Sequence, residues 1–311
     1  MRKFISLMLL FLASSCLAKN TVTDYQRIYL PVYTSDGSLM IALRVFKMND
    51  IPSFLVVNPE NFATKVLPVT QLQPRQNTIS KPGHYANWGI ASTPYYQILN
   101  KSTAAPYTME NQGITHAGIT TDKAILTADL CPSTKPFEAK FFNKLVQIAD
   151  KSNQPVPITI AISGLWILHH PQEFQWLINQ KQHNKLNITW ANHSFSHVYY
   201  HDQPYSQNFL LAPNTNLEVE ILLTEKYLLE AGETPSVFFR FPGLISDEHL
   251  IKELKKYGLI PLGADAWLAK SQPITPGAVI LVHGNSNEHE GIKILLPQLD
   301  NLHLIDIKKA L

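Results

Sequence analysis

The sequence predicts an α/β protein whose main part is a barrel of parallel strands, preceded by a small β-rich domain. Seven short apolar segments recur from residue 122 onward. Most are continuous rather than alternating, which is typical of parallel strands covered on both faces. Segments with helical periodicity lie between several of them, as expected for alternating strands and helices. No glycine-rich phosphate loop follows the first apolar segment, which favours a barrel over a doubly wound sheet.

Residues 1–18 have the three-part form of a secretory signal peptide: two cations, an apolar run, and small residues up to Ala18. The apolar run is too short to span a bilayer. A lipoprotein leader modified at Cys16 is the less favoured alternative, because the preceding residues lack the usual aliphatic side chain. We therefore expect an exported protein, periplasmic or secreted, without a transmembrane segment.

The composition restricts the possible partners. The chain has 26 Lys and Arg against 24 Asp and Glu, and the leader holds two of the cations, so the mature chain is balanced. Without a basic stripe, nucleic acid is not expected as a partner. The mature chain keeps one cysteine, Cys131, so no disulfide framework supports the fold. Nothing in the composition indicates the oligomeric state.

Residues 19–75 are expected to form the small β-rich domain. Three segments rich in Val, Ile, Tyr and Phe, "RIYLPVYT", "LMIALRVFKM" and "SFLVVN", are separated by the turn signals "SDGS" and "MNDIPS". Residues 76–121 carry Pro, Gly, Asn, Ser and Thr without clear periodicity. This long connecting segment is either an extended wrap or a loop that borders the site. His116, within it, is interpreted as an ordinary loop histidine.

Residues 122–311 supply the strands and helices of the barrel. The predicted strands are 124–130, 157–163, 187–192, 236–242, 259–265, 278–283 and 302–307. The predicted helices are 136–152, 171–180, 216–232 and 246–258. The last of these helices has the clearest end signals. Ser246 is its expected N-cap, acidic residues occupy its first turn and lysines its last turn, and Gly258 is expected to end it.

Polar side chains stand at the ends of five predicted strands: Asp129, His193 with His197, Arg240, Asp265 and His283. Reactive groups of parallel barrels lie at the C-terminal ends of the strands. Each residue alone also admits a structural role, such as a helix cap, a salt bridge or a satisfied core histidine. Trp267, two residues beyond Asp265, could likewise be a lid over the core. Polar side chains at the ends of five strands, all at the same end of the barrel, nevertheless favour a functional site.

The stretch "WANHSFSH" at 190–197 places His193 and His197 four residues apart. If the chain turns helical after the strand, both imidazoles lie on one face, close enough to share one metal ion. A pair of histidines at this spacing is often accidental, so its interpretation depends on the other strand ends.

Together these motifs resemble the polysaccharide deacetylase (NodB-homology) family, carbohydrate esterase family 4. "ILTADLCPS" is similar to the family's "LTFDDGPS", and "NHSFSH" to its H-S/T-x-x-x-H element. "RFPG", "ADAW" and "LVH" resemble its Arg-x-Pro, Asp/Trp and Leu-x-His motifs. The resemblance covers residues 122–311, and it implies a distorted (β/α)7 barrel.

The resemblance also implies a function: an exported hydrolase that removes N-acetyl groups from an amino-sugar polymer by metal-assisted attack of water. The implied cofactor is a divalent metal, zinc being favoured, and the implied substrate is peptidoglycan, a chitin-like glycan or a matrix polysaccharide. By this resemblance, His193 and His197 would be metal ligands. Asp129 would be the general base, supported by Arg240, and His283 the general acid, its charge supported by Asp265. Trp267 and Pro242 would line the sugar pocket.

The sequence departs from the family at one position of the metal site. Leu130 stands where the family has an Asp, its third metal ligand. Because side chains alternate along a strand, Asp129 does not take its place without local rearrangement. Cys131 replaces a glycine and is either a small turn residue or a thiolate ligand. His201 and Asp202 are other candidate substitutes.

Three functions are therefore compatible with the sequence. The first is an active deacetylase with an altered metal site. The second is a pseudoenzyme that binds glycan, and the third is a hydrolase of another amide or ester on the same barrel. Asp129, Arg240, Asp265 and His283 are all retained. This favours catalysis, because sugar binding alone needs no base or acid.

Overall fold

The computed structural model describes residues 19–74 and 89–311. The leader expected at residues 1–18, including Cys16, lies outside the described residues. Within the described part, none of the helices combines the length and the apolar character that a membrane span requires.

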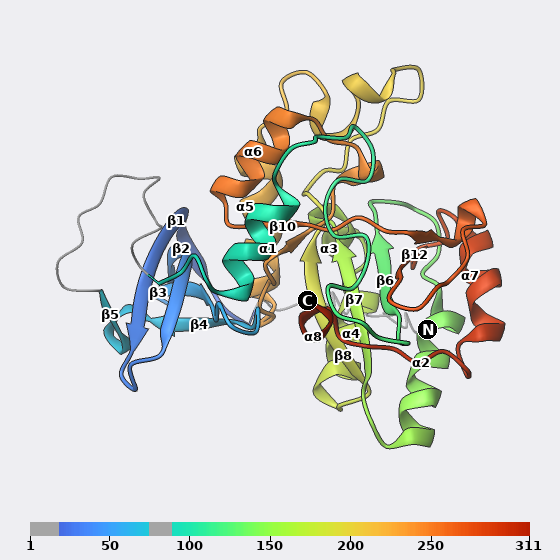
Figure 1. Cartoon of the computed structure of the whole chain (residues 1–311), viewed down its shortest axis with the longest axis horizontal. Helices are drawn as coiled ribbons and strands as arrows, with labels where there is room; N and C mark the ends of the chain where they lie inside the picture. Colours follow the sequence, from blue (N-terminus) through green and yellow to red (C-terminus); the bar gives the residue numbers. More distant parts are fainter. Residues whose placement is uncertain (1–18, 75–88) are drawn as a thin grey trace, which may run out of the picture.

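The N-terminal residues form a five-stranded antiparallel sheet with the order β4-β3-β2-β1-β5 (Figure 1). Its strands are β1 (Val22–Thr34), β2 (Leu39–Met48), β3 (Ile51–Val57), β4 (Thr64–Pro68) and β5 (Leu72–Pro74). Asn49 and Asp50 join β2 to β3, and both have positive φ. Positive φ at both positions of a two-residue loop gives the twist that an antiparallel hairpin needs. The turn predicted at "MNDIPS" is confirmed.

The main sheet has seven strands in the order β10-β9-β8-β7-β6-β12-β11, and every pair in it is parallel. The strands are β6 (Ile125–Leu130), β7 (Val156–Ile162), β8 (Leu186–Asn192), β9 (Phe238–Phe239), β10 (Ile260–Pro261), β11 (Ala266–Trp267) and β12 (Val279–His283). The sheet is curled into a half-barrel with β10 and β11 at its edges. This confirms the predicted α/β class with an N-terminal β sheet.

One of the seven predicted strands is wrong. The segment 302–307 contributes only an isolated bridge, between Leu304 and Ala124, because Asp306 already caps the last helix. The seventh strand is instead β11, which contains only two residues and so left no apolar run in the sequence. The strand predicted at 259–265 is also shorter, because the chain leaves the sheet after Pro261.

The helices are α1 (Pro94–Ser102), α2 (Ala139–Ser152), α3 (Gly164–His169), α4 (Pro171–Gln182), α5 (Leu217–Glu230), α6 (Glu248–Lys256), α7 (His289–Leu295) and α8 (Ile307–Ala310). The four predicted helices correspond to α2, α4, α5 and α6. The cap of α6 is Asp247, whose side chain accepts from the Leu250 N–H, and not the predicted Ser246. Ser246 is fully buried just before it.

The side chains of β6 alternate between the two faces of the curled sheet. Leu126, Ala128 and Leu130 join the core formed with Phe141 and Phe142 of α2. The intervening residues face the opposite, inner side, where Ile125 joins a second core. The inner face near the carboxyl end of β6 is therefore where a polar site can form.

The N-terminal sheet and the connecting segment pack on the inner core. Ile41 and Leu43 of β2 and Tyr95 of α1 join the same cluster as Ile125 and Leu281 of the main sheet. The connecting segment makes further bridges to the barrel, Glu110 to Ile245, Ile114 to Leu262 and His116 to Ala278. In its described part, residues 89–121, the connecting segment therefore lies along the barrel.

A buried ion pair joins the N-terminal sheet to the barrel. The guanidinium of Arg44 on β2 forms two bonds to Glu225 of α5, at 2.7 and 2.8 Å. The Tyr25 hydroxyl donates to the same carboxylate at 2.8 Å, and the Tyr257 carbonyl accepts from Arg44 at 2.8 Å. Both side chains are about 99% buried. Losing either partner would leave the other charge buried and unpaired.

Arg44→Met is therefore expected to lower the free energy of unfolding by about 3–5 kcal/mol, because Glu225 stays buried without its cation. Urea unfolding followed by circular dichroism measures the loss. The double variant with Glu225→Leu is expected to recover part of it. Lys47→Met, at an exposed pair with Asp24, serves as a control that leaves the curve nearly unchanged. Equal stability of wild type and Arg44→Met would contradict this assignment.

Candidate active site

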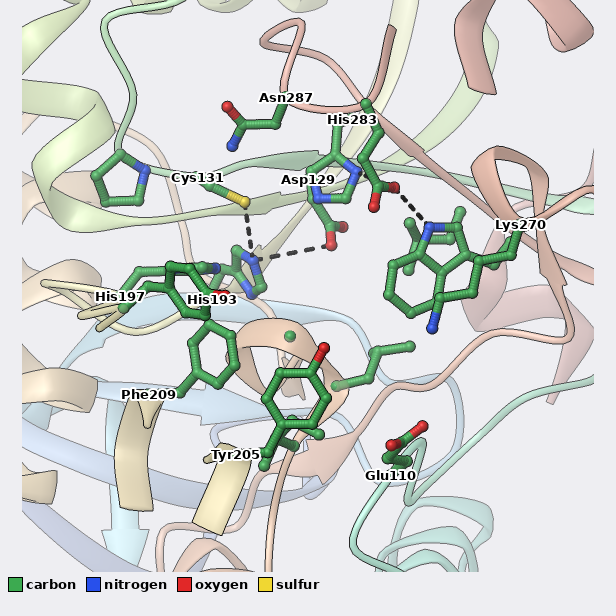
Figure 2. A pocket seen from close by; sticks show the side chains of 18 residues that line it. Glu110, Asp129, Cys131, His193, His197, Tyr205, Phe209, Lys270, His283 and Asn287 are labelled. Atoms are coloured by element: carbon green, nitrogen blue, oxygen red, sulfur yellow. Dashed lines mark hydrogen bonds and ion pairs between the residues drawn. The ribbon is translucent and has the colours of Figure 1, made fainter. Parts of the chain in front are cut away.

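A cavity of about 430 Å³ lies at the carboxyl ends of the parallel strands. Five residues expected at the site line it: Asp129, His193, His197, Trp267 and His283 (Figure 2). They follow or end strands β6, β8, β11 and β12, so the strand-end pattern brings them together as expected. The volume is within the range of small-molecule pockets.

Arg240 lies behind Asp129 as its partner. Its Nη1 donates to Asp129 Oδ1 at 2.6 Å and to Thr127 Oγ1 at 2.7 Å. Its other nitrogens donate to the carbonyls of Gly263 and Leu262. The guanidinium is fully buried, so these acceptors replace the water it has lost. One carboxylate oxygen of Asp129 is thereby held, and the other is left facing the cavity.

His193 is oriented by a bond on the far side of its ring. Its Nδ1 lies 2.8 Å from the backbone carbonyl of Arg240. A carbonyl only accepts, so Nδ1 carries the proton and a neutral ring has its lone pair on Nε2. That Nε2 lies 3.5 Å from the sulfur of Cys131 and 3.8 Å from Asp129 Oδ2 (Figure 2). The free lone pair of His193 therefore points toward the other polar groups of the site.

His193 and His197 lie close together although the chain between them is not helical. The chain after β8 is irregular, and Ser194 and His197 both have positive φ. The helical turn considered for this stretch is wrong, since left-handed residues interrupt a right-handed helix. The rings still lie 4.7 Å apart, centroid to centroid, edge to face. Phe209 also contacts the His197 ring edge to face, at a centroid distance of 5.5 Å.

Leu130 and Cys131 point to opposite faces of the sheet. Leu130 is fully buried in the outer core against α2 and does not face the histidines. The Cys131 sulfur is turned toward them, so Cys131 is more than a small turn residue. His201 and Asp202, the other candidate substitutes, are each about nine-tenths exposed and are not among the described residues that line the cavity.

Neighbouring histidines alter the acidity of Cys131. Burial raises the pKa of its thiol, but His197, His283 and His193 together outweigh burial and bring the pKa well below its usual value.

The donor groups of this cluster fit a divalent metal. One ligand atom each from Cys131, His193 and His197 can be chosen so that all three lie within 4.8 Å of one another. Catalytic zinc sites have three protein ligands and one open position. The fixed tautomer of His193 is a second feature typical of metal-binding histidines.

His283 lies beside Asp129, its partner in the β12–β6 strand pair, and also contacts Glu288. Its Nδ1 is 3.0 Å from Glu288 Oε2, off the line of a hydrogen bond, so the contact is an ion pair. The same oxygen accepts from Trp267 Nε1 at 2.6 Å. Burial lowers the pKa of His283, but Cys131 and Glu288 raise it well above its usual value. No motif or strand end marks Glu288 in the sequence.

Asp265 and Pro242 are placed differently from the expectation. Asp265 precedes β11 and lies beside the start of β12, where it accepts from the Val279 N–H at 2.8 Å and contacts His116 Nδ1 at 2.6 Å. It does not reach His283, and Glu288 occupies that place. His116, in the connecting segment, is the side-chain partner of Asp265. Pro242 is buried, and the cavity is lined instead by the residues that follow it.

The rim of the cavity is aromatic with scattered polar groups. Tyr199, Tyr205 and Phe209 come from the segment after His197, and both tyrosines are about half exposed. Lys270 Nζ lies 3.7 Å from the centre of the Trp267 ring. Glu110, from the connecting segment, and Asn287, from the loop after β12, complete the rim in Figure 2.

Comparison with known proteins gives one family match and several similar structures. Residues 23–96 match the family model described as the RP012 protein N-terminal domain. A family 4 carbohydrate esterase from Bacillus anthracis is 20% identical, with 72% of this chain and 94% of that chain aligned at a TM-score of 0.45. A CE4 family pseudoenzyme from Bacillus anthracis is 14% identical over 66% and 69% of the two chains, TM-score 0.44.

A third similar structure is a family 4 carbohydrate esterase from Streptomyces lividans in complex with acetate. It is 19% identical and aligns over 62% of this chain and 97% of that chain, with a TM-score of 0.42. At TM-scores below 0.5, these similarities do not by themselves assign a function to this chain. Function has to follow from the site.

Leu130→Asp is expected to lower the thermal midpoint without strengthening metal binding, because the new carboxylate enters the outer core and not the cavity. A buried, unpaired carboxylate together with the lost leucine should cost at least about 3 kcal/mol. Leu130→Ala is the matched control, which loses packing but adds no charge. Thermal unfolding and zinc competition with a chromophoric chelator measure the two effects. Tighter zinc binding by Leu130→Asp would show that position 130 reaches the metal.

Proposed function

We propose that this protein is a metal-dependent hydrolase that removes N-acetyl groups from an amino-sugar polymer. One observation carries the proposal. A buried carboxylate held by Arg240, a buried imidazole paired with Glu288, and a cluster of metal-ligand donors converge on one cavity. Amide hydrolysis needs a base for water, an acid for the departing amine and a site for the carbonyl oxygen, and these groups are suited to those tasks.

His193 and His197 would hold the divalent cation. When bound, such a cation polarises the acetyl carbonyl and makes water a better nucleophile near neutral pH. The protein's part is to keep His193 Nε2 free by engaging Nδ1 with the Arg240 carbonyl. The ring contacts of His197 with His193 and Phe209 limit the ring positions available to the second ligand.

Asp129 is the proposed general base. Its Oδ1 is engaged by Arg240, which leaves Oδ2 to take a proton from the attacking water. Oδ2 lies on the side of His193, where the cation would sit. Arg240 is a positioning residue, because its four hydrogen bonds go to Asp129, Thr127 and two backbone carbonyls and it is not among the described residues that line the cavity.

His283 is the proposed general acid. Glu288 faces its Nδ1 and stabilises the imidazolium, which leaves the Nε2 proton for the nitrogen of the sugar. The C–N bond breaks, the amine takes this proton, and acetate carries the water oxygen. Glu288 also holds the Trp267 indole, so one carboxylate positions both the acid and a wall of the cavity.

The rim supports a carbohydrate substrate. Pyranose rings present apolar faces that stack on aromatic side chains, and Trp267, Tyr199 and Tyr205 offer such surfaces around the cavity. Peptidoglycan, chitin-like glycans and matrix polysaccharides all contain N-acetylated sugars. Export, predicted from residues 1–18, would bring the protein to such polymers and is part of the proposal.

Acetate release from chitin oligomers and peptidoglycan fragments tests the reaction. The zinc-loaded protein is expected to release acetate, and removing the metal with a chelator to stop it. Asp129→Asn should lower kcat by about 10²–10⁴-fold, the range for loss of a general base. His116→Gln, outside the cavity, is the control with near wild-type activity. Circular dichroism checks that Asp129→Asn stays folded despite the unpaired Arg240.

Three outcomes separate the alternatives. No acetate from any acetylated glycan, with metal bound, would overturn the deacetylase proposal. Glycan binding without release, measured by calorimetry, would identify a glycan-binding pseudoenzyme. Hydrolysis of other amides or esters alone would identify a different hydrolase on the same barrel.

A further inference from the structure

We propose that Cys131 supplies the third protein ligand of the metal site as a thiolate, which makes the site selective for zinc or another thiophilic divalent metal. The inference rests on the metal site of the proposed function and adds a ligand that the resemblance does not imply. It starts from Leu130, whose side chain belongs to the outer core. The next residue, Cys131, follows the end of β6 and turns its sulfur toward His193.

The spacing of the donors fits tetrahedral coordination. With a Zn–S distance near 2.3 Å and a Zn–N distance near 2.0–2.1 Å, sulfur and nitrogen on one tetrahedral zinc are about 3.6 Å apart. The Cys131 sulfur and His193 Nε2 are 3.5 Å apart. His197 contributes the third ligand atom within 4.8 Å of both others.

Two outer contacts hold Cys131 and His193 in this relation. Asn285 Nδ2 donates to the Cys131 carbonyl at 2.6 Å, and Asn285 is fully buried. The Arg240 carbonyl holds His193 Nδ1 from the opposite side. Outer contacts of this kind orient metal ligands and are a regular part of protein metal sites.

The charge of the site is also preserved. Replacing the expected carboxylate by Leu130 removes one negative charge, and a Cys131 thiolate restores one. The nearby carboxylate of Asp129 does not need to ligate the metal, since its Oδ1 is committed to Arg240. Asp129 therefore stays available as the base.

The donor set determines the class of metal. Thiolate and imidazole ligands select zinc and chemically similar ions, whereas Mg²⁺ and Ca²⁺ require oxygen ligands. We infer that Zn²⁺ and Co²⁺ bind and that a large excess of Mg²⁺ does not displace them.

Cobalt substitution tests the thiolate directly. The full chain carrying Cys16→Ser leaves Cys131 as the sole thiol. Metal-free protein is titrated with Co²⁺, and the expected result is a near-ultraviolet thiolate-to-cobalt charge-transfer band with intense visible bands of tetrahedral cobalt. Zinc binding should protect Cys131 from alkylation by iodoacetamide. Absence of the band at saturating Co²⁺ would overturn the inference.

Three variants sharpen the test. Cys131→Ser is expected to lose the band and to weaken zinc binding more than about 100-fold, beyond the roughly 10–100-fold loss typical of an outer contact. Cys131→Asp should lose the band but retain cobalt, because a carboxylate can replace the thiolate. Asp129→Asn, a neighbour that is not a ligand, should keep the band. Zinc affinity unchanged in Cys131→Ser would refute the assignment even if a band were seen.

The two proposals fail separately. A charge-transfer band without acetate release leaves the thiolate ligand in place and removes the deacetylase function. Acetate release by a protein without the band leaves the function and removes the thiolate ligand.

Discussion

The alternation of side chains along β6 is the constraint on which the site depends. Successive residues of a strand face opposite sides of the sheet, so Asp129 of β6 faces inward and Leu130, its last residue, faces outward. The outer side is a tightly packed core with α2, and an apolar residue belongs there. Cys131, the first residue after β6, turns its sulfur toward His193, so a thiol lies beside the histidines although position 130 carries no carboxylate.

Arg240 connects the parts of the site that β6 brings inward. Its guanidinium pairs with Asp129, and its own carbonyl fixes the ring of His193. A fully buried cation is costly unless it is hydrogen-bonded, and two backbone carbonyls beyond β10 accept from Arg240 in addition to Asp129 and Thr127. The proposed base and one proposed ligand are therefore held by one side chain and its own peptide group.

A second carboxylate organises the part of the cavity formed by β11 and β12. Glu288 contacts both His283, the proposed acid, and Trp267 of the cavity wall, so one side chain positions both. Glu110 comes to the rim from the segment that precedes the barrel, which makes bridges to Ile245, Leu262 and Ala278. The N-terminal sheet covers the inner core and is tied to α5 by Arg44. The described residues before 122 thus contribute to the shape of the cavity as well as to its support.

The amino-acid sequence by itself determined the α/β class, six of the seven strands, four helices and the strand-end residues Asp129, His193, His197, Arg240 and His283. These follow from local signals: apolar runs, periodicity, caps, and polar residues where a strand ends. Tertiary structure decided the rest. Strand β11 is too short to carry a pattern, and Glu288, Glu110 and the tyrosines of the rim come from loops whose paths local preferences do not specify. Local signals also do not specify which of Leu130 and Cys131 faces the histidines. The packing of α2 against the outer face of the sheet decides this, because it takes up the side chain of Leu130.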